Sequence, residues 1–85
     1  MKFYNNLPEE QETIINLDYY ARRLTIYTSR KKQIENLTKA LGEPNILFTI
    51  KDKVCGCKWN IPFENTKATS KALSRPLLIG TLNQG

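Results

Sequence analysis

The sequence predicts a small single α+β domain: an antiparallel sheet with one main helix and one short helix on one of its faces. Three observations predict this class. Short β-type runs alternate apolar and polar residues, a central segment carries a helical stripe, and a shorter segment near the end carries helix-forming residues behind capping candidates. The predicted order is β-β-α-β-β-α with room for a last strand, and hairpins that alternate with helices are typical of α+β folds.

The first hairpin is predicted from two β-type runs, Thr13–Asp18 and Leu24–Ser29. Apolar residues recur with a period of two in both runs, for example at Ile15 and at Ile26, as half-buried strands require. The residues between the runs, YYARR at 19–23, have the length of a hairpin loop.

The main helix is predicted over residues 30–41, because the apolar spacing changes there to three and four. The stripe consists of Ile34, Leu37 and Leu41. Thr28 or Ser29 can serve as the N-cap. Gly42 is a natural residue to end the helix, and Pro44 follows where a helix cannot continue.

The second hairpin is predicted from ILFTIK at 46–51 and VCGCKWNI at 54–61, with a tight turn at Asp52-Lys53. The first of these strands has its apolar residues at Ile46, Phe48 and Ile50, again with a period of two. A short helix is expected within 65–74, and a last short strand or an extended tail at 77–80.

Both cysteines fall in the predicted strand at 54–61. Cys55, Cys57, Trp59 and Ile61 alternate along it and therefore share one face, which we interpret as the core face. Two cysteines without a histidine are too few for a structural zinc site, and a C-x-C spacing is not the C-x-x-C of redox sites. Buried free thiols are the favoured interpretation, and a metal site shared between two chains is the remaining alternative.

The chain divides into a flexible N-terminal arm at 1–10, one domain at 11–80 and a C-terminal tail at 81–85. Its 85 residues provide a small core. The longest aliphatic run has only three residues, 77–79, and the N-terminus has no signal-peptide pattern. We therefore expect a cytoplasmic protein with no membrane partner.

The net charge of +5 is unevenly distributed. Residues 1–18 contain one cation against four acids, a net charge of −3, and residues 19–85 contain twelve cations against four acids, a net charge of +8. A basic body attracts anionic partners over long range, although such a surface can also simply be solvated.

The residue types disfavour an enzyme. The absence of histidine removes Ser-His and Cys-His pairs and the usual acid-base group near neutral pH. The carboxylates show no paired spacing, and no glycine-rich phosphate loop is present. We expect no catalytic residues, no metal and no small-molecule cofactor.

The first candidate binding segment is the start of the main helix, where Arg30, Lys31 and Lys32 follow one another. Helix N-termini carry partial positive charge and favour acidic residues, so three cations there oppose the usual preference. The same arrangement suits a phosphate or an acidic side chain. The alternative interpretation is that exposed and screened cations cost little at this position.

The second candidate segment is the hairpin loop, where Tyr20 lies beside Arg22 and Arg23. Aromatic rings next to guanidinium groups can hold the bases and phosphates of nucleic acids, and they are equally favoured at protein–protein hot spots. The neighbouring Tyr19 can instead continue the inward face of the first strand as part of the core rim.

Three stretches of the chain form a recognisable pattern that covers most of residues 8–80: ETIINLDYYARRLTIYTSRKKQIENLTKALGEP, WNIPF and KALSRPLLIG. In these stretches the chain resembles small proteins of Gram-positive bacteria, their phages and mobile elements. The most recognisable pieces are LTIYTSRK and LSRPLLIG. The resemblance implies no established activity and no catalytic residues, but it favours accessory roles, including interference with host defence systems, over metabolism.

Two functions therefore follow as expectations. The first is a non-enzymatic small basic binding protein that contacts nucleic acid through the hairpin loop and the helix start. The second is a phage or mobile-element accessory protein that binds and inhibits a host protein, of the anti-defence or anti-CRISPR type. Both would use the six residues named above, Tyr20, Arg22, Arg23, Arg30, Lys31 and Lys32.

Overall fold

A computed structural model describes residues 2–73 of the chain. Its elements are a short 3-10 helix η1 (Pro8–Glu10), β1 (Thr13–Asp18), β2 (Arg23–Thr28), α1 (Lys31–Leu41), β3 (Ile46–Ile50), β4 (Lys53–Pro62) and α2 (Thr66–Leu73). The predicted class and the order β-β-α-β-β-α are confirmed. The last strand expected at 77–80 lies outside the described residues.

The four strands form one antiparallel sheet in the order β1-β2-β4-β3. One hairpin consists of β1 and β2, the other of β3 and β4, and α1 connects the two. The hairpins pair through β2 and β4, which are therefore the two central strands of the sheet. Ile26 of β2 lies opposite Ile15 of β1 on one side and opposite Trp59 of β4 on the other. The inward residues of three strands therefore form one row across the sheet.

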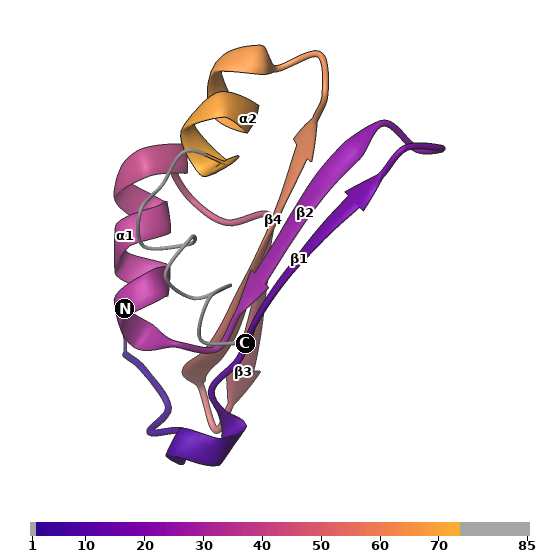
Figure 1. Cartoon of the computed structure of the whole chain (residues 1–85). Coiled ribbons are helices and arrows are strands. Elements are labelled where there is room, and N and C mark those ends of the chain that lie inside the picture. Colours follow the sequence, from indigo (N-terminus) through magenta and orange to yellow (C-terminus); the bar gives the residue numbers. More distant parts are fainter. Residues whose placement is uncertain (1, 74–85) are drawn as a thin grey trace.

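Both helices cover the same face of the sheet, and the core lies between them and the strands (Figure 1). The buried apolar residues are Leu24, Ile26, Ile34, Leu37, Val54, Cys57, Trp59, Ile61 and Ala72. The predicted stripe of α1 faces this core, with its last residue, Leu41, partly buried. Trp59 also donates its indole N–H to the carbonyl oxygen of Gly42 at 3.0 Å, which fastens the end of α1 to the sheet.

The start of α1 differs from the prediction of a hydroxyl N-cap. The N-cap is Arg30, and no side chain caps the helix. The two predicted hydroxyls have other partners: Thr28 Oγ1 accepts from the Arg30 backbone N–H at 3.1 Å, and Ser29 Oγ accepts from the Glu12 backbone N–H at 2.9 Å. These side chains stabilise the junction of β1, β2 and α1, and Gly42 ends the helix as predicted, with φ at 88°.

A β-bulge changes the prediction for the cysteine strand. Phe48 pairs with Gly56 and Thr49 pairs with Val54, so Cys55 is an extra residue in β4 without a partner in β3. An extra residue shifts the alternation of side chains, which places Val54 in the core. The predicted core position is confirmed for Cys57, Trp59 and Ile61 and is wrong for Cys55, which is only half-buried.

The predicted apolar set of β3 lies on the face of the sheet that the helices leave uncovered. The Phe48 ring packs edge-on against Tyr27, with 5.5 Å between ring centroids. Tyr27 lies between the buried residues Ile26 and Thr28 in β2 and therefore points away from the helices. We call this uncovered side, which also carries Ile14, the open face.

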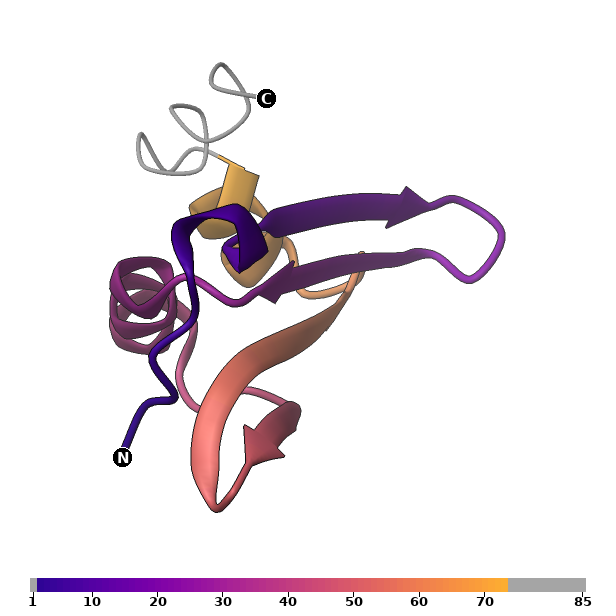
Figure 2. The ribbon, with the colours of Figure 1, turned by 90° about the horizontal axis from the view of Figure 1, so that it is seen from below.

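The segment predicted to be a loose arm pairs with the sheet. Val54 donates its backbone N–H to the Lys2 carbonyl at 2.8 Å, and Tyr4 donates its own to the Val54 carbonyl at 2.7 Å. The Asn6 side chain donates to the Cys55 carbonyl at 3.1 Å. The arm thus lies beside β4 where β2 has ended, next to the start of α1 (Figure 2).

Candidate binding site at the helix start and the hairpin loop

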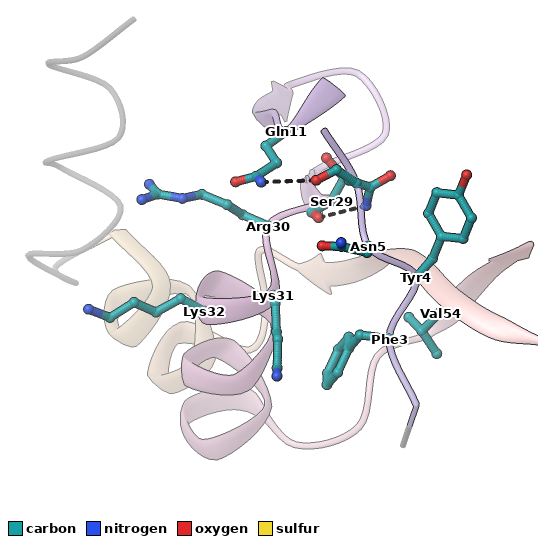
Figure 3. A pocket seen from close by; sticks show the side chains of 10 residues that line it. Phe3, Tyr4, Asn5, Gln11, Ser29, Arg30, Lys31, Lys32 and Val54 are labelled. Carbon is teal, nitrogen blue, oxygen red and sulfur yellow. Dashed lines mark hydrogen bonds between the residues drawn. The ribbon is translucent and has the colours of Figure 1, made fainter. Parts of the chain in front are cut away.

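A pocket of about 510 Å³ lies where the N-terminal arm passes the start of α1 (Figure 3). Its lining comes from three segments: the N-terminal residues 3–11, residues 29–32 where β2 leads into α1, and Val54 of β4. The lining residues are Phe3, Tyr4, Asn5, Asn6, Gln11, Ser29, Arg30, Lys31, Lys32 and Val54. Three of them are cations and none is a carboxylate, so the lining is positively charged.

The three predicted cations of the helix start lie on different sides of this pocket. Arg30 and Lys32 extend to one side, while Lys31 extends toward the aromatic ring of Phe3 (Figure 3). The Lys31 Nζ lies 5.4 Å from the centroid of that ring, within the range of a cation–π interaction. The first turn of α1 contains no acidic residue, so its backbone N–H groups add to the positive potential of the pocket.

The opposite wall of the pocket is polar and comes from the arm. The Gln11 side chain donates an N–H to the backbone carbonyl of Asn6 at 3.3 Å. The Asn6 side chain in turn donates an N–H to the backbone carbonyl of Ser29 at 3.2 Å. The first bond lies within the N-terminal segment, and the second holds this segment against the residue just before Arg30. The sequence reasoning missed this wall, because Tyr4-Asn5-Asn6 shows no periodic pattern and its contacts are with residues far along the chain.

The hairpin loop exposes the other predicted residues. Tyr20 is fully exposed, and Arg22 and Arg23 are exposed beside it. Arg22 has a positive φ of 56°, and its side chain forms an exposed ion pair with Glu64, with Nε 3.7 Å from Oε1. An exposed pair of this kind contributes little to stability and leaves the guanidinium group accessible to a ligand.

Tyr19 occupies a different position from Tyr20. Its ring packs edge-on against Phe63, with 6.2 Å between centroids, and Phe63 itself packs against the core. Tyr19 is nevertheless 77% exposed. It therefore contacts the rim of the core, as the sequence suggested, but it is not buried there.

The two basic segments lie at opposite ends of β2 (Figure 1). The strand begins at Arg23 and ends at Thr28, and its six residues span roughly 20 Å at about 3.3 Å per residue. The helix start and the hairpin loop are therefore two separate basic surfaces rather than one patch.

Across residues 2–73, no group of three or more His, Cys, Asp or Glu side chains is placed to hold a metal ion. Burial raises the pKa of the Cys57 thiol to about 11. This thiol consequently stays protonated and is a poor nucleophile and metal ligand near neutral pH. None of the helices in this part of the chain is long and apolar enough to cross a membrane.

Comparison with protein-family models, with curated proteins and with solved structures finds no match for this chain.

Proposed function

We propose that this chain is a non-enzymatic small basic binding protein that contacts nucleic acid through the helix start and the hairpin loop. The observation that carries the proposal is the pocket at the start of α1, which gathers three cations and polar side chains without a carboxylate. Phosphate oxygens suit such a site, because they accept from amides and ammonium groups and are favoured at helix N-termini.

The separation of the two basic segments supports an elongated ligand. Arg30 and Lys32 at one end of β2 would hold one phosphate group, and Arg22 and Arg23 at the other end would hold a second. A distance of roughly 20 Å between the ends of the strand suits a stretch of nucleic-acid backbone better than a single small anion. Tyr20, exposed beside the arginines, would stack on a base.

The compartment we propose is the cytoplasm. Cys55 and Cys57 are both free thiols, and a reducing compartment keeps such thiols reduced.

The test is a double charge reversal at the helix start, Arg30→Glu with Lys31→Glu. Fluorescence anisotropy with labelled single-stranded and duplex oligonucleotides should show binding by the wild type and at least a tenfold loss for the variant. The slope of log affinity against log salt should also become shallower, because fewer counterions are released. Thermal melting should stay close to that of the wild type, because acids at the N-cap and first turn of α1 are favourable and offset the loss of the contact between Lys31 and Phe3.

The matched control is Lys39→Glu with Lys67→Glu, which changes the net charge equally at exposed positions outside the pocket. It should lower affinity much less than the helix-start variant. If both variants lose the same affinity, binding depends on the net charge of the protein and not on the helix start. If Arg30→Glu with Lys31→Glu binds as tightly as the wild type, the helix start is not part of the binding site.

The second candidate is an accessory protein of phages or mobile elements that binds and inhibits a host protein, of the anti-defence or anti-CRISPR type. The observation in its favour is the fully exposed Tyr20 beside two arginines, because Tyr and Arg are enriched at protein–protein hot spots. A pull-down from host lysate with and without nuclease separates the candidates. A partner that survives nuclease and high salt favours the inhibitor, and one that is lost under both conditions favours nucleic acid.

A further inference from the structure

The open face of the sheet carries two aromatic rings beside one glycine of β4. Phe48 of β3 lies directly opposite Gly56, and the Tyr27 side chain reaches across to the same residue. A Cβ atom at Gly56 would lie 2.9 Å from the Tyr27 hydroxyl oxygen, so the lack of a side chain there lets the ring lie close to the strand. The rings pack edge-on, Tyr27 is half-buried and Phe48 is 40% exposed. The sheet therefore presents an aromatic pair at its uncovered surface.

Two lysines flank this aromatic pair along β4. Lys53 and Lys58 are the only charged residues of β3 and β4. Both lie on the open face, because their neighbours Val54 and Trp59 are buried on the helix side. They are roughly 15 Å apart at about 3.3 Å per residue, and Gly56 lies between them. The strand thus presents a cation, an aromatic pair and a second cation in succession.

The acids near the open face belong mainly to the opposite edge of the sheet. Glu12 directly precedes β1 and Asp18 ends it. Burial first, and then Glu12, raise the pKa of Tyr27, so its hydroxyl is uncharged near neutral pH. The turn between β3 and β4 adds Lys51 and Asp52, whose charges cancel. The half of the open face that β3 and β4 form is therefore positive.

The open face continues into the surface of the hairpin loop. Arg23 and Tyr27 lie on the same side of β2, because they alternate with its buried residues. Between them, Thr25 pairs with Asn60 of β4, and the Thr25 hydroxyl donates to the Asn60 side-chain oxygen at 3.4 Å. An arginine assigned above to the hairpin-loop surface thus borders the face that holds the aromatic pair, with polar side chains between them.

We propose that the open face binds single-stranded nucleic acid, with Lys53 and Lys58 on phosphate groups and the rings of Tyr27 and Phe48 stacked on bases. The inference rests on the proposed function and names its ligand class, since the bases of a duplex are paired and stacked inside it and do not reach the rings. Exposed aromatic side chains on a sheet, combined with cations along the backbone path, are the means by which proteins hold single strands. The net charge of +5 favours such a polyanion over an uncharged partner.

The test separates the contribution of bases from that of phosphates. Fluorescence anisotropy compares a labelled single strand, its matched duplex and a strand of equal length that carries no bases. The wild type should bind the single strand at least tenfold more tightly than either of the others. Phe48→Leu and Tyr27→Leu keep an apolar side chain but remove the ring. Each should lose at least fivefold in affinity for the single strand and nothing for the base-free strand.

Two matched controls accompany these variants. Ile46→Leu changes an apolar residue of the same strand and face that has no ring, and it should bind like the wild type. Lys58→Gln should weaken binding of the single strand and the base-free strand alike, and should reduce the slope of log affinity against log salt by about 0.7. Lys39→Gln removes an equal charge at an exposed position of α1 and should leave this slope nearly unchanged.

A crosslinking experiment on the wild type locates the contact even if a ring variant fails to fold. Ultraviolet irradiation of a bound strand that contains 5-iodouracil should label a peptide with Tyr27 or Phe48, as mass spectrometry can show. Crosslinks confined to the helix start or to Tyr20 would overturn the inference. So would equal affinity for single strand and duplex, or unchanged single-strand binding by folded Phe48→Leu and Tyr27→Leu.

These failures differ from a failure of the proposed function. A chain that binds duplex and single strand equally, and loses both through Arg30→Glu with Lys31→Glu, retains the proposed function without the open-face site. A chain that binds none of the oligonucleotides loses both proposals.

Discussion

The two faces of the sheet are built from the same four strands but differ in what covers them. On the helix side, Ile26 and Trp59 are almost completely buried beneath α1 and α2. On the open face, Ile14 and Phe48 are 51% and 40% exposed, although they are as apolar as the residues of the core. Small or polar residues such as Cys57 and Thr28 are meanwhile buried on the helix side.

This comparison shows that alternation identifies a strand without identifying its inner face. In β3 the apolar residues with a period of two all lie on the uncovered face, next to Tyr27. Burial is decided by where the helices pack, and the apolar residues on the other side of the strands stay exposed.

The largest expected effect is on the helix-covered face. Leu37→Ala should lower the free energy of unfolding by about 2–4 kcal/mol, because it removes a side chain that is 2% exposed from a small core. Urea unfolding followed by circular dichroism measures the change. Ile14→Ala on the open face is the control and should cost well under half as much, so equal losses would contradict the assignment of the two faces.

Cys57→Ser should cost about 1–3 kcal/mol, because it buries a hydroxyl group in an apolar cluster with few partners. Cys55→Ser should cost clearly less, since Cys55 lies in the bulge outside this cluster. The same unfolding measurement compares the two variants. A larger loss for Cys55→Ser would mean that β4 has a regular register without the bulge.

Gly56→Ala tests the contact between Gly56 of β4 and the Tyr27 side chain on the open face. A Cβ atom there would lie 2.9 Å from Cε2 and from the hydroxyl oxygen of Tyr27, which is too close, so the Tyr27 side chain must move. The expected loss is about 1 kcal/mol, at the low end of the cost of overpacking, because the ring is partly exposed and can shift. Combining the change with Tyr27→Ala should remove most of this loss, and simple additivity of the two effects would show that the ring does not lie over Gly56.

The smallest expected effect is the change in stability with pH that comes from the Cys57 thiol, because this change falls well above neutral pH. Burial first, and then the neighbouring Cys55 and Glu43, raise the pKa of Cys57 from 9.0 to about 11. The buried protonated thiol therefore contributes stability that is fully present below pH 9 and is lost as the pH rises toward about 11. Below pH 9, a thiol reagent should modify Cys55 well before Cys57 in the native protein, as mass spectrometry of the labelled peptides can show. Modification of Cys57 at the same rate as Cys55 would contradict its burial.

The sequence by itself determined the elements, because their signals are local. The helical stripe of α1, its end at Gly42 and the two hairpins depend on backbone hydrogen bonds and spacings within about a dozen residues. That the helix-start cations line one pocket could likewise be predicted, since Arg30, Lys31 and Lys32 are consecutive.

Only the tertiary structure decided which face of the sheet is covered, where the bulge falls and how the arm binds. Thr28 and Ser29 were plausible caps, but their hydroxyls bond at the β1–β2–α1 junction. The polar wall of the pocket comes from Asn6 and Gln11, which meet the helix start across more than fifteen residues of chain. Such contacts depend on packing between distant segments, and no local spacing in a single sequence encodes them.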